Sequence, residues 1–305
     1  MKKHFCFAAL IYSALLGTAY ALDLFLNTNT ATGFLMKGSS VWRYVLLMPA
    51  LLLCFLTGLY VPKKQPCGLS MHPGAQRLET WLYLPAALAA TVYGALRIVA
   101  AATGQVGDLS EHHAIDLSWR NNVLCVLEGV CAALFLVLAV WCLMRLFACH
   151  GGYPSAPWTK YLGLLGGAAF YLHAVICFIG QPSSLHRLAP AVTMLAALSS
   201  LLFASSLMRA VYLPEACVTA PPLARSGLLA FCCCTCLALP QMIWQQVTGA
   251  LDVSSIALVS LQAAIGVLGA VCAWRIAKRP PRERRAKEPE PEPAPEVPPV
   301  AVPEA

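Results

Sequence analysis

Three ionisable side chains lie inside stretches that are otherwise apolar, and their types and depth could support chemistry. Arg97, Glu128 and His173 each lie about seven residues from the predicted external end of an apolar segment, which is roughly 10 Å deep at 1.5 Å per residue. A charged group in hydrocarbon costs at least a few kcal/mol, so it persists only where a partner or a ligand compensates for it. Arg97 and Glu128 lie on consecutive antiparallel segments and can form an ion pair. The pattern predicts one polar layer in the external half of the membrane.

This polar layer has two main interpretations. In the first, Gln241 and Gln245 extend the layer into a pocket that binds or transports a small polar solute or an ion. In the second, Arg97 extends to the lipid head groups, Glu128 pairs with it, and His173 forms a hydrogen bond between helices. The second interpretation predicts a non-catalytic membrane subunit or scaffold, with a membrane protein as its partner. A membrane-embedded enzyme that uses Glu128 or a histidine loop is a third alternative.

A polar segment over residues 104–121 concentrates side chains that could bind a metal ion. Histidine together with carboxylates suits zinc or another divalent ion. However, adjacent histidines point in different directions and the chain has no HExxH helix, so a solvated acidic loop is the alternative. The candidate ligands are Asp108, Glu111, His112, His113 and Asp116.

The chain has 14 cysteines, and five consecutive positions, 232–236, hold four of them. On a membrane helix such a run could transfer copper or zinc, but successive helical residues are about 100° apart, so only Cys232 and Cys236 should share a face. Small-residue packing is the favoured alternative. No cysteine lies in a predicted external loop, so a structural disulfide is not expected.

The composition of the chain indicates which kind of secondary structure positions the candidate residues. Only 11% of the chain is charged, 59% is hydrophobic and the mean hydropathy is +0.67, whereas an ordinary soluble domain is about 25% charged. Lipid must therefore be the solvent for most of the chain, and an ordinary soluble globule is excluded. We predict an all-α integral membrane protein, a bundle of about eight transmembrane helices. The predicted spans are residues 5–22, 43–61, 81–103, 122–147, 161–180, 190–213, 226–245 and 256–274.

Sequence motifs of soluble enzymes are missing. The chain has no GxxxxGKS/T phosphate loop and no GxSxG nucleophile elbow, so an enzyme is the less favoured class. A single histidine lies deep in a predicted span, so a bis-histidine haem is not expected and no cofactor is predicted.

The net charge of +7 is an orientation signal. Basic residues gather on one side of the predicted spans, and basic residues stay cytoplasmic during insertion. The pattern predicts a plasma-membrane protein with both termini cytoplasmic and the 104–121 segment external. It does not indicate binding to nucleic acid.

The first apolar segment has a rival interpretation. Lys2 and Lys3 precede an apolar run, and Ala19, Tyr20 and Ala21 have the small-x-small form of a signal-peptidase site. Cleavage after Ala21 would leave seven spans. Retention as a first helix is favoured because the apolar run continues beyond this site.

We divide the chain into a helical bundle over residues 1–275 and a cytoplasmic tail over residues 276–305. Residues 275–287 are basic and directly follow the last span, so they should contact anionic lipid head groups. Residues 288–305 are rich in Pro and Glu and should form a disordered tail, which solubilises the end of the chain or docks a partner.

Small residues predict where helices approach closely. Ala86, Ala90 and Gly94 lie four residues apart in the third span, and Gly163 and Gly167 do the same in the fifth. Prolines inside three spans predict kinks at Pro49, Pro85 and Pro240.

Overall fold

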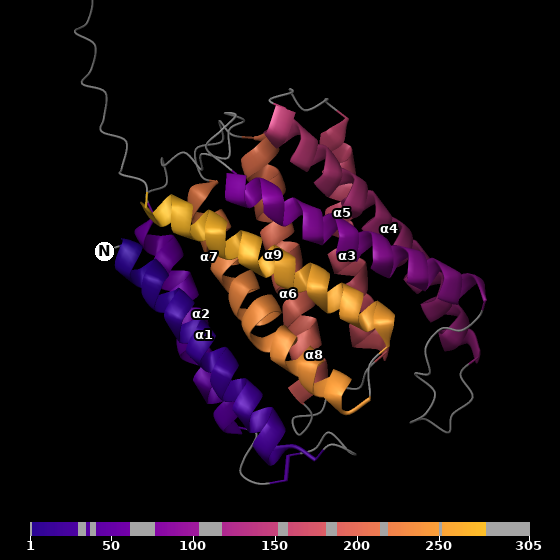
Figure 1. The fold of residues 1–305 in the computed structure, drawn as a ribbon, viewed down its shortest axis with the longest axis horizontal. Helices are drawn as coiled ribbons and strands as arrows, with labels where there is room; N and C mark the ends of the chain where they lie inside the picture. The colour runs from indigo at the N-terminus through magenta and orange to yellow at the C-terminus, as the bar shows by residue number, and fades with distance from the viewer. Residues whose placement is uncertain are drawn as a thin grey trace, which may run out of the picture.

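The structure is a computed structural model, which describes residues 2–29, 35–36, 41–61, 77–103, 118–151, 158–180, 188–213, 219–249 and 252–278. Eight helical stretches in this part of the chain are long and apolar enough to cross a membrane, and the predicted all-α membrane bundle is confirmed (Figure 1). The elements are α1 (Lys2–Asn27), α2 (Val41–Tyr60), α3 (Arg77–Ala102), α4 (Ser118–Gly151), α5 (Thr159–Gly180), α6 (Leu188–Tyr212), α7 (Ala220–Ala230), the π-helix η2 (Phe231–Leu237), α8 (Ala238–Val247) and α9 (Val253–Lys278).

The seventh span is longer than the sequence predicted. It runs continuously through α7, η2 and α8, from Ala220 to Val247, so it begins six residues before the predicted start at 226. Pro221 and Pro222 occupy its first turn, where no backbone N–H is needed and proline's fixed φ suits a helix. Residues 279–305 lie outside the described residues, so the disordered tail stays a prediction.

Helix α9 occupies the centre of the bundle. In its most apolar 18-residue window, 67% of the residues are buried, the highest share among the eight spans. It packs against α3 on one side and against α7 and η2 on the other, and in Figure 1 it crosses the bundle diagonally beside α3. A helix that is apolar on all its faces can be surrounded in this way.

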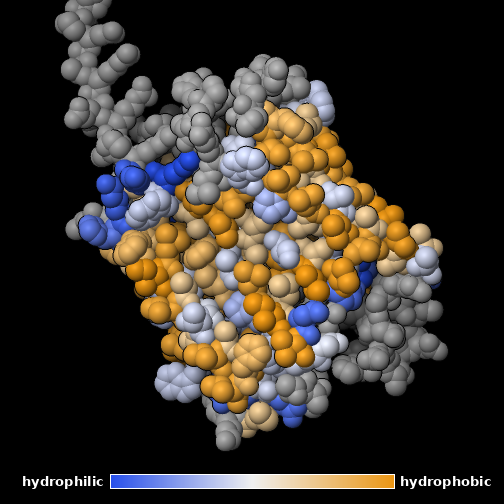
Figure 2. Space-filling model, in the orientation of Figure 1, coloured by the Kyte–Doolittle hydropathy of each residue, from blue (hydrophilic) through white to orange (hydrophobic). Residues whose placement is uncertain are grey.

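The other helices form two groups around α9. Helices α3, α4, α5 and α6 each pack on the next in chain order, whereas the α1–α2 hairpin packs against α7, η2 and α8. On the face that Figure 2 shows, the surface between the two ends is mostly apolar. Large apolar side chains of the described residues are exposed, among them Leu52, Leu164 and Phe178. Such a surface fits lipid contact.

Glycines allow α7 and α9 to cross closely. A Cβ added to Gly227 would lie 2.5 Å from the carbonyl oxygen of Gly269, and one added to Gly269 would lie 2.6 Å from that of Gly227. One turn away along α9, Gly266 packs against the backbone of Ala230 and the side chain of Thr235. Thr235 also donates a hydrogen bond to the carbonyl oxygen of Ala263, at 3.2 Å. Small residues of this kind let helix backbones approach in lipid.

The small-residue predictions for α3 and α5 are confirmed in part. Ala86 and Ala90 are buried, and a Cβ on Gly94 would lie 2.9 Å from the carbonyl oxygen of Ala132 on α4. On α5, Gly163 packs against Trp141 and Met208 as expected, but a Cβ on Gly167 would have no neighbour within 4 Å. The prediction for Gly167 is wrong because α5 presents Gly166 to α4 instead, where a Cβ would lie 2.8 Å from the Cα of Leu138.

Proline affects the seventh span where α1 contacts it. Pro240 has no N–H, so the carbonyl of Cys236 loses its α-helical donor, and the π-helix η2 lies directly before it. Gly17 of α1 faces that carbonyl, with only 2.5 Å left for an added Cβ. The missing side chain at position 17 thus lets α1 approach an altered segment of backbone.

We expect Gly227→Ala to lower the free energy of unfolding by about 1–3 kcal/mol, because the new methyl group meets backbone and the two helices must separate. Gly167→Ala is the matched control, since nothing lies within 4 Å and alanine is favoured in a helix. Thermal unfolding of both variants in detergent micelles measures the difference. Equal losses for both would contradict the close crossing.

Candidate functional site

The predicted ion pair between α3 and α4 is present. Nη1 of Arg97 lies 3.5 Å from Oε2 of Glu128, and the two side chains are 19% and 10% exposed. Consecutive antiparallel helices packed side by side place both residues at the same depth, as the sequence indicated.

This ion pair leaves hydrogen-bonding groups unused. Nε of Arg97 is buried and has no hydrogen-bond partner among the described residues. The 3.5 Å contact is also longer than the roughly 2.7–2.9 Å of a charge-assisted hydrogen bond. Because buried polar groups are almost always paired, the unpaired Nε donor of Arg97 calls for a further partner such as water, an ion or a solute.

Asp252 adds a second carboxylate near Arg97. It caps α9: Oδ1 accepts a hydrogen bond from the N–H of Ser255 at 3.0 Å, and Oδ2 accepts one from Oγ of Ser254 at 2.9 Å. Burial by itself would raise the pKa of Asp252, but these hydrogen bonds and the charge of Arg97 hold it below its ordinary value. The sequence analysis did not include Asp252 in the layer, although an aspartate just before an apolar helix with serines in its first turn is a capping signal.

His173 lies close to the ion pair in a buried, largely aromatic setting. The residue is 7% exposed, its Nε2 lies 3.5 Å from Sγ of Cys177, and its ring centroid lies 6.4 Å from that of Phe135. Phe135 also contacts Tyr93 of α3 edge to face, with centroids 5.0 Å apart. Within the described part of the chain, His173 has no hydrogen bond to Arg97 or Glu128. Its polar contact is with Cys177 on its own helix.

The two glutamines lie in α8, and one of them contacts α1. Oε1 of Gln241 accepts a hydrogen bond from the hydroxyl of Tyr20 on α1 at 3.1 Å, and the backbone carbonyl of Gln245 accepts one from Oγ1 of Thr248 at 2.9 Å. The seventh span thus brings Gln241 to α1, and the place of Gln241 and Gln245 in the polar layer stays a prediction.

The predicted metal ligands all belong to one segment, residues 108–116. Asp108, Glu111, His112, His113 and Asp116 lie outside the described residues, so metal binding by this segment stays a prediction. The described residues contain no group of three or more His, Cys, Asp or Glu side chains that could hold a metal ion.

The cysteine run does not form the regular α-helix that the sequence analysis assumed. It lies in η2, and Cys232, Cys233, Cys234 and Cys236 are all buried. Sγ of Cys234 lies 3.3 Å from Oγ of Ser199 and 3.2 Å from that of Ser200, both on α6. Burial on every side supports the packing interpretation, because α1, α6 and α9 all contact η2.

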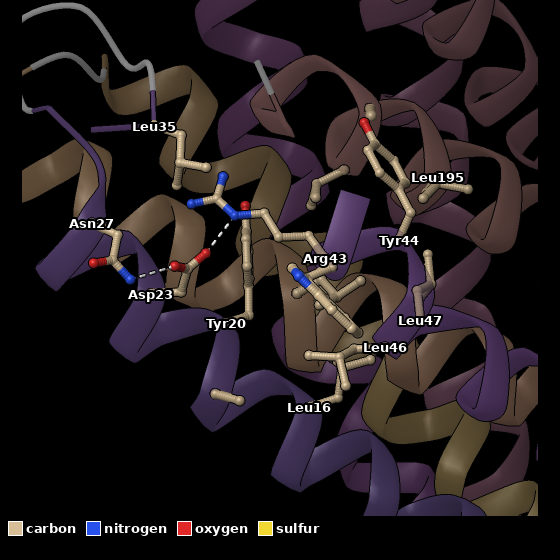
Figure 3. A pocket seen from close by; sticks show the side chains of 15 residues that line it. Leu16, Tyr20, Asp23, Asn27, Leu35, Arg43, Tyr44, Leu46, Leu47 and Leu195 are labelled. Carbon is tan, nitrogen blue, oxygen red and sulfur yellow. Dashed lines mark hydrogen bonds and ion pairs between the residues drawn. The ribbon is translucent and has the colours of Figure 1, made fainter. Parts of the chain in front are cut away.

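A cavity of about 290 Å³ lies between the α1–α2 hairpin and α6, away from the ion pair (Figure 3). Its lining is mainly apolar and includes none of Arg97, Glu128 and His173. One part is polar: Nε of Arg43 donates to Oδ2 of Asp23, and Nδ2 of Asn27 donates to Oδ1 of Asp23 at 2.8 Å. This cavity was not predicted from the sequence, because its lining comes from helices that are far apart in the chain.

The chain matches no protein-family model, no curated protein and no solved structure in the three comparisons made. The described residues contain two polar sites that bear on function. One is the Arg97–Glu128 layer, where Nε of Arg97 has no hydrogen-bond partner among the described residues, and the other is a cavity with a polar wall.

The Arg97–Glu128 pair predicts a non-additive mutant cycle. We expect Arg97→Leu and Glu128→Leu each to cost about 2–3 kcal/mol, somewhat below the roughly 3–5 kcal/mol of a fully buried pair because Arg97 is partly exposed. The double variant should be close to the wild type, since no charge is left without its partner. Unfolding midpoints of the four proteins give the coupling energy, and simple addition of the two losses would contradict it.

Proposed function

We propose that this multi-pass membrane protein binds a small polar solute or ion at the Arg97–Glu128 layer and transports it. The observation that carries the proposal is the buried Nε of Arg97, which has no hydrogen-bond partner among the described residues, beside a carboxylate held only by a long contact. A solute with a donor and an acceptor could bridge the two side chains. Polar groups at such depth in a membrane are costly and commonly mark a solute path.

The charges favour particular solutes. Arg97 faces two carboxylates, those of Glu128 and Asp252, so the site has an excess of negative charge. The N-terminus of α9 offsets part of the charge of Asp252. A neutral solute, a proton or a small cation is therefore favoured over an anion.

We further propose that the protein lies in the plasma membrane with both termini cytoplasmic and α1 retained. The rings of Phe7 and Trp274 are 6.2 Å apart, so the N-terminal end of α1 lies beside the C-terminal end of α9. Exposed Lys3 and Lys278 and the half-buried Arg275 give this corner a hydrophilic surface (Figure 2). Such a basic corner suits the cytoplasmic leaflet, where residues 275–287 would contact anionic head groups.

A scaffold role is the second candidate, and one observation favours it. The 290 Å³ cavity does not include Arg97 or Glu128 in its lining. In a scaffold, the ion pair would only join α3 to α4, and a membrane protein partner would carry the activity. The transport experiment below separates the two candidates.

In proteoliposomes, we expect at least one solute to show uptake that falls about tenfold or more in Glu128→Gln, because loss of the carboxylate removes an acceptor and a charge. The probes are sodium, potassium, ammonium, protons followed with a pH dye, and neutral amino acids. Glu304→Gln, in the C-terminal tail, is the control and should transport like the wild type. If no probe is transported and none raises the unfolding temperature, the transport proposal is wrong and the scaffold candidate is favoured.

The orientation predicts which engineered cysteines react in intact cells. A membrane-impermeant maleimide should label Gln246→Cys, which is exposed at the predicted external end, and should not label Lys3→Cys or Lys278→Cys until the cells are opened. The unmodified protein controls for its native cysteines. The reversed labelling pattern would overturn the proposed orientation.

A further inference from the structure

The cavity between the α1–α2 hairpin and α6, here called the hairpin cavity, has a buried floor and a rim open to lipid. Trp42 and Leu46 on the rim are 66% and 46% exposed. Ala19 of α1 and Ala191 of α6 lie on opposite walls. The buried floor is formed by Leu16, Tyr20, Val192 and Leu237. A molecule dissolved in the bilayer could therefore enter the cavity sideways.

Polar and apolar groups are separated within the hairpin cavity. Figure 3 shows Asp23, Asn27 and the guanidinium of Arg43 together on one side, with Leu35 beside them. The other labelled leucines lie away from these polar groups: Leu16, Leu46, Leu47 and Leu195. Arg43 also donates from Nη2 to Oγ1 of Thr28 at 3.2 Å. This division matches a ligand with a polar head and an apolar body.

The ion pair determines the charge of that head. Arg43 and Asp23 form a contact pair whose side chains are only 10% and 27% exposed, so their charges cancel in a region of low dielectric. An anionic head would be repelled by Asp23, and a cationic head by Arg43, and each would also lose its hydration. An uncharged hydroxyl can donate to a carboxylate and accept from a guanidinium at once.

The volume determines the size of the apolar body. An engineered apolar cavity of about 150 Å³ holds one benzene molecule, so a cavity of about 290 Å³ holds roughly twice as many carbon atoms. This is near the lower limit of known ligand pockets. A complete two-chain phospholipid is far too large for it.

We infer that the hairpin cavity is a binding site for a small uncharged amphiphile, with a hydroxyl head at Arg43 and Asp23 and a single apolar chain of about ten carbons against the leucine wall. This site shares no residue with the Arg97–Glu128 layer. It stands or falls independently of the transport proposal.

The test uses the full chain in lipid nanodiscs and a decanol analogue that carries a photoreactive diazirine, with labelled peptides identified by mass spectrometry. We expect labels on the α1, α2 and α6 peptides that line the cavity, and loss of these labels in the presence of excess decanol. Decane, decanoate and decylammonium have the same chain length, and each should compete about tenfold less well than decanol. Decane lacks the hydroxyl, and the other two carry a charge.

Two matched variants on one helix keep the test specific. Ala19→Phe places a ring in the hairpin cavity and should reduce the competed labelling about tenfold or more, whereas Ala14→Phe, also exposed on α1 but absent from the lining, should leave it unchanged. Ala191→Phe fills the cavity from the opposite wall and should act like Ala19→Phe. Labelling that decanol does not displace, or equal effects of Ala19→Phe and Ala14→Phe, would overturn the site. Better competition by decanoate or decylammonium would overturn the uncharged head.

Discussion

The close crossing of α7 and α9 at Gly227 and Gly269 is the constraint on which the rest of the bundle depends. Lipid tails are as apolar as leucine, so helices in a membrane are held together by tight packing and not by exclusion of water. Each glycine lies against the carbonyl of the other, which brings the two backbones as near as the helices allow. Through α9, the crossing also positions α3, because α9 packs against both neighbours along its length.

The two polar sites lie at one end of this framework, and the basic corner lies at the other. Asp23 is near the C-terminal end of α1 and Arg97 is near that of α3, while Arg43 and Asp252 are near the N-terminal ends of α2 and α9. Alternating helix directions bring these four positions to the same side. Each cation there meets a carboxylate from another helix, which lowers the cost of burying both charges.

Individual residues show how far the sequence predicts this structure. The Arg97–Glu128 pair was predictable because consecutive helices are neighbours and both residues lie at one depth. Gln241 was at the right depth but points to Tyr20 on α1, because depth says nothing about the direction that a side chain faces around the helix axis. Likewise, Gly166 and not Gly167 contacts α4, because the face of α5 that meets α4 is centred one residue earlier than the sequence predicted. For the cysteine run, the predicted helical geometry was wrong for another reason: residues 231–237 form a π-helix, in which the angle between successive residues differs from that of an α-helix.

The sequence by itself predicted about eight helical spans, because a stretch of apolar residues about 20 long has no other stable state in lipid, and the described residues contain eight helices long and apolar enough to cross a membrane. It also predicted the ion pair between Arg97 and Glu128. Only the tertiary structure decided which distant helices meet, and so created the hairpin cavity from α1, α2 and α6. In a soluble protein the apolar stripe of a helix marks its inward face, but here the lipid-facing and protein-facing sides are both apolar, so the sequence carries little information about which side faces which neighbour.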